Sequence, residues 1–169
     1  MKTVFMILML MMSLHADVSL HKSLLSQGST SVGIRLGGAS IGNQNYTIFG
    51  VSGNYFLIEN LSVGVGYEKW FSGNPSIQKL TLESTYFIPA SENIRPYLGV
   101  FGRRILISGS DRLGREFDDT NSYGYRAGIA LLQNNLVLSA GIVQEKYDST
   151  QRLFNETQTY AEVTVGVAF

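Results

Sequence analysis

The chain has 169 residues and carries 13 Lys and Arg against 13 Asp and Glu, so its formal net charge at pH 7 is zero. This balance argues against nucleic-acid binding, which requires a strongly basic face. The sequence has no cysteine, which excludes disulfides and a lipid-modified cysteine. Its hydrophobic content is 44 %, yet beyond the first residues no apolar run is long enough for a membrane-spanning helix.

Residues 1–16 have the pattern of a secretory signal peptide. Lys2 supplies a positive charge, residues 4–12 form an uncharged apolar run, and Ala16 is small enough to precede a cleavage site. The run is shorter than the roughly 20 apolar residues that a membrane helix needs. We therefore expect residues 1–16 to be removed, and we expect residues 17–28 to form a polar lead without assigned structure.

From Thr30 onward the chain repeats one pattern, an alternating apolar and polar run followed by a turn. Such alternation is typical of β-strands, whose successive side chains point to opposite faces. Most runs have the roughly 9–11 residues of a tilted membrane strand. No stretch has a sustained helical period. The sequence predicts eight strands, at residues 30–38, 46–57, 61–69, 77–88, 97–107, 123–132, 136–146 and 158–169.

The connections between these runs fall into two classes that alternate along the chain. Residues 59–60, 89–96 and 133–135 follow the even-numbered runs, and residues 39–45, 70–76, 108–122 and 148–157 follow the odd-numbered ones. The second class is longer on the whole. Short turns alternating with longer loops predict an all-β fold, an eight-stranded antiparallel up-and-down barrel over residues 29–169, with both termini at the same end.

The alternating runs have one apolar face and one face that carries charges and many glycines. Alternation alone does not say which face points outward. Glycine suits the crowded interior of a narrow barrel. Bulky aromatics such as Tyr67, Tyr86 and Tyr123 lie near run ends on the apolar face, where a membrane-interface girdle is expected. We therefore expect a transmembrane barrel whose charges point inward: Arg35, Lys79, Arg103, Arg126, Glu68, Glu83, Glu145 and Glu162.

These eight charges sum to zero, and we expect them to form a paired network that closes the lumen, because an unpaired buried charge is costly. In antiparallel neighbours the residue numbers of facing positions add to a constant, which suggests partners. The expected pairs are Glu68 with Lys79, Glu83 with Arg103, Arg126 with Glu145, and Glu162 with Arg35.

The last run ends on an aromatic residue. Residues 159–169 alternate strictly, with Val163, Val165, Val167 and Phe169 on one face. This end resembles the C-terminal signature of bacterial outer-membrane β-barrels. Together with the signal peptide, the eight runs and the two classes of connection, it makes the whole mature chain resemble the small eight-stranded outer-membrane barrels. The transmembrane domain of outer-membrane protein A and its short-loop relatives are members of that family.

The resemblance implies residence in the outer membrane of a Gram-negative bacterium, with both termini and the 17–28 lead in the periplasm. It also implies recognition of the terminal residues by the barrel-assembly machinery, delivery by periplasmic chaperones, and contact with outer-membrane lipid and lipopolysaccharide. We expect a monomer.

Some barrels of this kind are enzymes, and their sites generally use a histidine as acid or base. This chain has His15 in the signal peptide and His21 in the lead, with none in a run or an outside loop. Ser108, Ser110 and Asp111 lie together, but a serine nucleophile needs a base within reach. We therefore expect no catalytic residue and no cofactor.

Metal binding has little support either. Four acids in the third outside loop offer oxygen ligands suited to calcium, but their spacing matches no known cation-binding motif: Asp111, Glu116, Asp118 and Asp119. Arg112 and Arg115 offset their charge. A solvated loop is the preferred interpretation.

Lys69, Arg104 and Lys146 fall on the apolar face near the outside ends of the third, fifth and seventh runs. One hypothesis is that they snorkel to the outer rim and bind lipopolysaccharide phosphates. The other is that they are solvated strand ends. In either case they are spread around the rim and do not form one pocket.

The sequence thus favours a non-enzymatic outer-membrane barrel with a structural or surface-interaction role and a lumen closed by paired charges. One alternative is a narrow or gated pore. Another is a soluble secreted β-barrel that binds a small ligand, which requires the apolar face to point inward.

Overall fold

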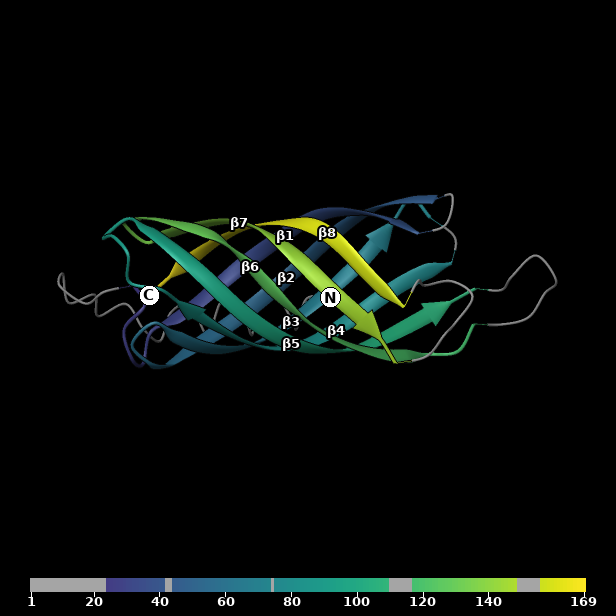
Figure 1. Ribbon diagram of the computed structural model, residues 1–169, viewed down its shortest axis with the longest axis horizontal. Helices are drawn as coiled ribbons and strands as arrows, with labels where there is room; N and C mark the ends of the chain where they lie inside the picture. The colour runs from purple at the N-terminus through teal and green to yellow at the C-terminus, as the bar shows by residue number, and fades with distance from the viewer. Residues whose placement is uncertain (1–23, 42–43, 74, 110–116, 149–155) are drawn as a thin grey trace, which may run out of the picture.

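The computed structural model describes residues 24–41, 44–73, 75–109, 117–148 and 156–169, so the expected signal peptide lies outside the described residues. The strands form a closed antiparallel barrel in chain order, with β8 paired back to β1 (Figure 1). This confirms the predicted fold. The strands are β1 (Thr30–Ile41), β2 (Gln44–Ile58), β3 (Leu61–Phe71), β4 (Ser76–Phe87), β5 (Ile94–Ser108), β6 (Thr120–Gln133), β7 (Leu136–Tyr147) and β8 (Thr157–Ala168).

The two ends of the barrel differ in their connections. The turn end carries the β2–β3, β4–β5 and β6–β7 connections, of two, six and two residues, and the C-terminus. The loop end carries the β1–β2, β3–β4, β5–β6 and β7–β8 connections, of two, four, 11 and nine residues, so only the last two are clearly the longer loops that the sequence predicts. Asn60 and Asn134 adopt left-handed backbone conformations in the tightest turns, with φ of 63° and 53°. Asparagine is among the few residues that enter this region readily.

Several strands run further than their alternating patterns predict. β5 starts at Ile94 and β6 at Thr120, three residues earlier than expected in both cases. Pro96 lies inside β5 because its carbonyl alone joins the ladder, accepting a hydrogen bond from Ile88 N at 2.7 Å. A proline at such a position removes no needed donor and does not end the strand.

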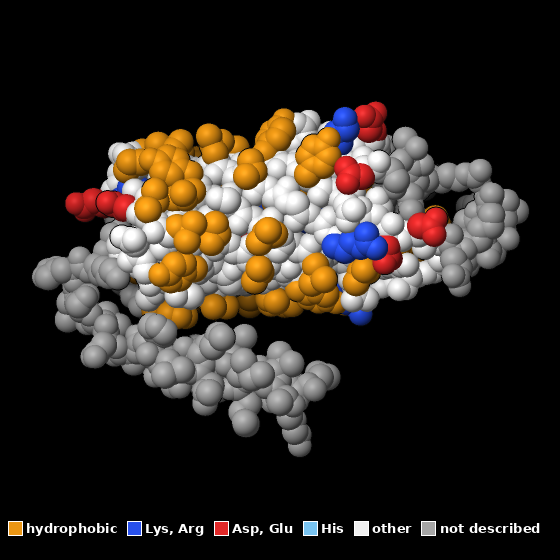
Figure 2. Space-filling model, turned by 90° about the horizontal axis from the view of Figure 1, so that it is seen from below, with side chains coloured by type: hydrophobic (Ala, Val, Ile, Leu, Met, Phe, Trp, Pro, Cys, Tyr) orange, Lys and Arg blue, Asp and Glu red, His pale blue; other side chains and the backbone are white. Residues whose placement is uncertain are grey.

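The two faces of the barrel wall point as expected for a membrane barrel. Apolar side chains on the outer face are widely exposed, among them Leu82, Val65 and Ile142 at 67 %, 63 % and 61 %. Figure 2 shows these hydrophobic side chains over the wall, with Lys, Arg, Asp and Glu gathered toward the two ends. All eight predicted inward charges are buried. The soluble-barrel alternative requires the reverse arrangement and does not fit this structure.

The lumen is filled in layers along the barrel axis. An apolar cluster at the loop end includes Trp70, Ile77, Phe101 and Tyr160. A smaller apolar cluster at the turn end combines Leu25 with Phe56 and Leu132. The charged side chains lie between the two. Within the part of the chain that the structure describes, there is no helix long and apolar enough to cross a membrane.

Leu25 shows that the expected N-terminal lead is structured in its last residues. Its side chain is 1 % exposed, and its carbonyl accepts a hydrogen bond from Asn60 N at 2.8 Å. Gly28 N donates to the Phe56 carbonyl at 2.9 Å. Residues 24–28, which the sequence left without assigned structure, therefore pack against the turn end of the barrel.

Two facing glycines make room for a tyrosine inside the wall. Gly128 on β6 pairs with Gly141 on β7, and the Tyr97 hydroxyl packs against both. A Cβ added at Gly128 would lie 2.7 Å from that hydroxyl, and one added at Gly141 would lie 2.5 Å from the Ala127 carbonyl oxygen. The glycines thus let the strand backbones approach closely at this point.

We predict that Gly141→Ala lowers the free energy of unfolding by about 1–3 kcal/mol, because the new methyl overpacks the wall against backbone atoms. Gly53→Ala is the matched control, since a Cβ at Gly53 meets nothing within 4 Å. We expect it to be neutral or slightly stabilising. Urea unfolding of the refolded protein in lipid vesicles measures both, and equal effects would contradict the packing assigned to Tyr97.

Candidate functional site: a buried charge network

The eight inward charges come from seven strands and meet in the middle of the lumen. Each is at most 5 % exposed. They point inward because they fall on the inward positions of the alternating strand pattern. Six strands, β1, β3, β5, β6, β7 and β8, supply one charge each, and β4 supplies two. The side chains are Arg35, Glu68, Lys79, Glu83, Arg103, Arg126, Glu145 and Glu162.

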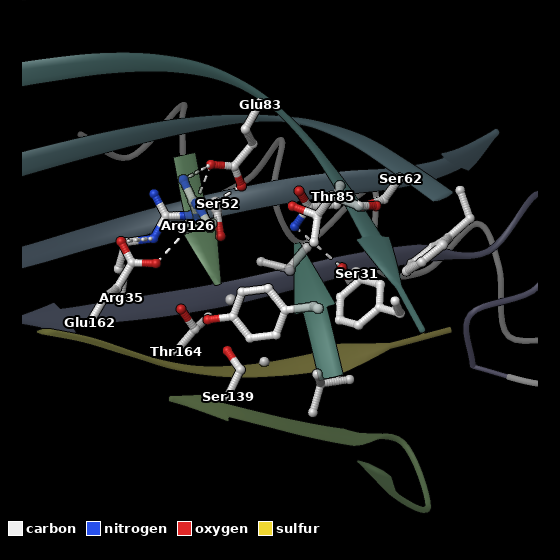
Figure 3. A pocket seen from close by; sticks show the side chains of 18 residues that line it. Ser31, Arg35, Ser52, Ser62, Glu83, Thr85, Arg126, Ser139, Glu162 and Thr164 are labelled. Atoms are coloured by element: carbon white, nitrogen blue, oxygen red, sulfur yellow. Dashed lines mark hydrogen bonds and ion pairs between the residues drawn. The ribbon is translucent and has the colours of Figure 1, made fainter. Parts of the chain in front are cut away.

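Four of them form a closed ring of alternating charge, the Arg35–Glu83–Arg126–Glu162 ring. Arg35 Nη2 lies 3.0 Å from Glu83 Oε1, and Arg126 Nη2 lies 2.7 Å from Glu83 Oε2. Arg126 Nη1 lies 3.2 Å from Glu162 Oε1, and Glu162 Oε2 lies 3.2 Å from Arg35 Nε. Figure 3 shows the four side chains converging. Since they come from β1, β4, β6 and β8, the ring spans the lumen.

The other four lie toward the loop end and centre on Glu145. Glu145 Oε2 is 2.7 Å from Lys79 Nζ and 3.1 Å from Arg103 Nη1, and it accepts a hydrogen bond from the Tyr160 hydroxyl at 2.9 Å. The Ser122 hydroxyl donates to Glu145 Oε1 at 2.5 Å. This carboxylate therefore has protein partners on both of its oxygens.

Lys79 is fully buried, and aromatic rings as well as a carboxylate surround it. Its Nζ lies 4.1 Å from the centre of the Trp70 ring, with the Tyr147 and Tyr160 rings further away. The Tyr147 hydroxyl lies 3.3 Å from the same nitrogen. Such cation–π contacts are strongest where water is excluded, as in this lumen.

Glu68 joins the two groups into one network. Its Oε1 lies 2.9 Å from Arg35 Nη1 in the ring and 3.1 Å from Arg103 Nη2 beyond it. Four positive and four negative side chains are thus paired inside the barrel. A lumen of eight strands is only wide enough for side chains, so these pairs occupy its cross-section.

The predicted partners are only partly right. Arg35 and Glu162 form an ion pair, and Glu68 faces Lys79 in the β3–β4 register. Lys79 nevertheless binds Glu145, and Glu68 binds the two arginines.

The other two expected pairs are wrong. Glu83 binds Arg35 and Arg126 in place of Arg103, and Arg126 binds Glu83 and Glu162 in place of Glu145. Adding residue numbers across a turn identifies facing residues on adjacent strands. Long side chains in a narrow lumen instead reach across it to strands that are not adjacent. Glu83 and Arg103 are also two positions out of register, because Thr81 faces Arg103.

A small cavity of about 70 Å³ lies between the ring and the turn end. Hydroxyl side chains line it, including Ser52, Thr85, Ser139 and Thr164, together with the ring residues (Figure 3). These hydroxyls were not predicted as site residues, although their positions in the alternating pattern place them on the inward face. The cavity has room for a few water molecules and is too small for an organic substrate.

The catalytic and metal candidates of the third loop gain no support. Ser110, Asp111 and Glu116 lie outside the described residues. Asp119 lies 3.5 Å from Arg104 and accepts a hydrogen bond from Ile107 N at 3.2 Å. The described residues contain no group of three or more His, Cys, Asp or Glu placed to hold a metal ion.

The three proposed rim cations lie on β3, β5 and β7 near the loop end, as expected. Arg104 is 3.5 Å from Asp119, Lys146 Nζ is 3.2 Å from Glu156, and Lys69 lies over the Phe71 ring at 5.5 Å. Two of the three therefore already have acidic partners. Lipopolysaccharide binding by these residues stays a prediction.

The terminal strand places its valines on the outer face. Val163, Val165 and Val167 are exposed, and Phe169 pairs through its backbone with Thr30, with N···O distances of 2.8 and 2.9 Å. The terminal aromatic thus lies at the closing seam, at the turn end. Its role as an assembly signal stays a prediction.

No model of a known protein family matches the sequence, and no curated protein sequence matches it. Solved structures do match. The N-terminal β-barrel domain of Pseudomonas aeruginosa OprF aligns with a TM-score of 0.68 at 18 % identity, covering 85 % of this chain and 98 % of that domain.

Two other solved barrels are similar. Neisserial surface protein A aligns with a TM-score of 0.60 at 17 % identity over 83 % of this chain and 94 % of its own. Ail of Yersinia pestis aligns at 0.53 and 14 % identity over 85 % and 100 %. The chain has the fold of the small eight-stranded outer-membrane β-barrels.

We predict that Glu83 couples energetically to Arg126 and only weakly to Arg103. A double-mutant cycle of Glu83→Ala with Arg126→Ala should give a coupling of about 1–3 kcal/mol, because each single change leaves a buried charge without its partner. The cycle of Glu83→Ala with Arg103→Ala is the control. It should give a clearly smaller coupling, because these two side chains share the network but form no direct ion pair. Unfolding in lipid vesicles measures both, and the opposite ranking would refute the ring.

Proposed function

We propose that this protein is a non-enzymatic integral barrel of a Gram-negative outer membrane, with a closed lumen and a structural or surface-interaction role. The inverted polarity of the barrel is the observation that carries this proposal. Apolar side chains cover the outside, and eight charges are buried within. An exposed apolar outer face is favourable only in contact with lipid. Buried charges on the inner face are stable only when they pair with one another.

The proposed surface role draws on the asymmetry of the barrel ends. The turn end is compact, with Leu25 packed into it and the C-terminus beside Thr30. We assign this end to the periplasm and the loop end to the outside. Two of the similar structures are named as a surface protein and an attachment invasion locus protein, which supports contact with external partners.

The chemistry of the network supports a structural role for it and not a catalytic one. Each of the four buried glutamates is paired with at least two cations. A general acid or base must be able to exchange its proton with a reacting group. Carboxylates that are paired with two cations are suited to closing the lumen and not to exchanging protons with a substrate.

We expect the protein to fractionate with the outer membrane and to migrate faster on detergent gels before boiling than after it, because a folded barrel stays compact until heated. In planar bilayers it should show no sustained conductance, since the ring and the two apolar clusters fill the lumen. Recovery from the periplasmic fraction would refute the membrane assignment. Steady ion currents would instead favour the narrow-pore alternative.

We expect Phe169→Ala to reduce the amount of folded protein in the outer membrane severalfold while changing stability by less than about 1 kcal/mol. The Phe169 side chain is only half-buried, and its backbone pairing with Thr30 does not need the ring. Val100→Ala on β5 is the control for loss of apolar area on the outer face, because Val100 is exposed and lies outside the terminal strand. Wild-type outer-membrane levels of the Phe169 variant would remove the assembly-signal hypothesis.

A further inference from the structure

The wall of the barrel is incomplete at the β1–β8 seam near the loop end. The two strands pair from Ser31↔Ala168 as far as Gly37↔Glu162, and the ladder stops there. β1 continues to Ile41 and β8 begins at Thr157. Within the described residues, 38–41 pair only with β2 and 157–161 pair only with β7. In the same register, Ser40 would face Thr159.

Backbone groups point into this seam. In an antiparallel ladder, alternate residues direct both N–H and C=O to the same neighbour. Thr30 and Phe169 exchange both bonds across the seam, which fixes the alternation for both strands. By this alternation, Ser40 on β1 and Thr159 on β8 direct their backbone N–H and C=O into the open part.

A polar cavity of about 180 Å³ lies at this seam, and residues of both faces line it. Ser40, Thr157 and Thr159 are exposed on the outside, whereas Gln158 and Tyr160 are buried toward the lumen. The cavity therefore extends from the outer surface into the barrel wall. The Gln158 side chain is 8 % exposed. Its Nε2 has no hydrogen-bond partner among the described residues, while its Oε1 accepts a hydrogen bond from the Tyr147 hydroxyl at 3.0 Å.

The two edges also lack the features that keep edge strands from pairing with other chains. Natural edges are protected by charges, prolines or bulges. Residues 38–41 and 157–161 read Gly-Ala-Ser-Ile and Thr-Gln-Thr-Tyr-Ala, with no charge and no proline. Threonine and tyrosine have high β-propensity, so the β8 edge suits strand pairing.

We propose that this seam is a binding site for an extended polypeptide segment, which adds as a strand to the edge of β1 and accepts a hydrogen bond from the Gln158 amide. Main-chain hydrogen bonds supply the affinity in this mode of recognition. The short, polar cavity favours a short segment with uncharged, mostly polar side chains. Such a partner approaches from the loop end, so the site deepens the surface-interaction role of the proposed function and depends on it.

The absence of cysteine permits a direct test. Ser40→Cys with Thr159→Cys places two thiols on the exposed face across the seam, and oxidation locks it shut. Leu36→Cys with Val163→Cys is the matched control, because this outward pair already lies inside the ladder. The probe is a dye-labelled peptide with the sequence of residues 157–161, which is complementary to the unpaired part of the β1 edge. The same peptide with Thr159→Pro lacks one N–H donor.

We expect saturable, weak binding of the probe to the folded protein in nanodiscs, and binding at least about tenfold weaker when the Ser40–Thr159 disulfide forms. Reduction should restore it. The Leu36–Val163 disulfide should leave binding unchanged, and the proline peptide should bind poorly. Binding that survives the lock, or no saturable binding, overturns the proposal.

Amide hydrogen exchange provides a measurement that does not depend on the probe. We expect the Ser40 and Thr159 amides to exchange at least about tenfold faster than those of Leu36 and Val163, and to slow on oxidation of the lock. Equal protection in the unlocked protein means that the seam is closed, which refutes the site while leaving the outer-membrane barrel intact. Failure to fractionate with the outer membrane would refute the proposed function itself.

Discussion

The pairing of buried charges is the constraint on which this barrel depends. Eight strands enclose a space that side chains fill, and here the space contains four cations and four glutamates. Each glutamate bridges at least two cations, and Arg35 contacts three glutamates. Removing one member therefore deprives its buried neighbours of one of their partners. The interactions that close the lumen are the same ones that hold opposite walls of the barrel together.

The apolar clusters at the two ends make this pairing stronger. The loop-end cluster and the Leu25 cluster separate the charges from bulk water at both ends of the barrel. Electrostatic attraction grows as the surroundings become less polar, and so does the cost of an unpaired charge. Leu25 closes the turn end next to the cavity, because it packs against Phe56, which lines that cavity. The sequence of residues 17–28 did not indicate this role.

The two-residue period was sufficient to predict the strands and to place the eight network charges on one face of them. The closed topology came from the alternating classes of connection, and the inward direction of the charges came from the positions of the glycines and aromatics. The period could not predict partners. Register relates adjacent strands, whereas the Arg35–Glu83 pair joins β1 to β4 and the Lys79–Glu145 pair joins β4 to β7. Those contacts depend on side-chain length and the width of the lumen. The packing of Leu25 and the end of the β1–β8 ladder were also missed, because neither leaves an alternating pattern.

The network and the seam meet at one residue. Glu162 is the last β8 residue paired with β1, opposite Gly37, and it is also a member of the ring. Its carboxylate binds Arg35 on β1 at the level where the ladder stops. Toward the turn end, backbone hydrogen bonds join β1 to β8, and at Glu162 the ion pair joins them as well. Toward the loop end, Ser40 and Thr159 are joined by neither kind of interaction. The Arg35–Glu162 ion pair is therefore the last interaction that joins β1 to β8 before the ladder ends. It opposes further opening of the seam toward the membrane interior, where unpaired backbone groups cost several kcal/mol each.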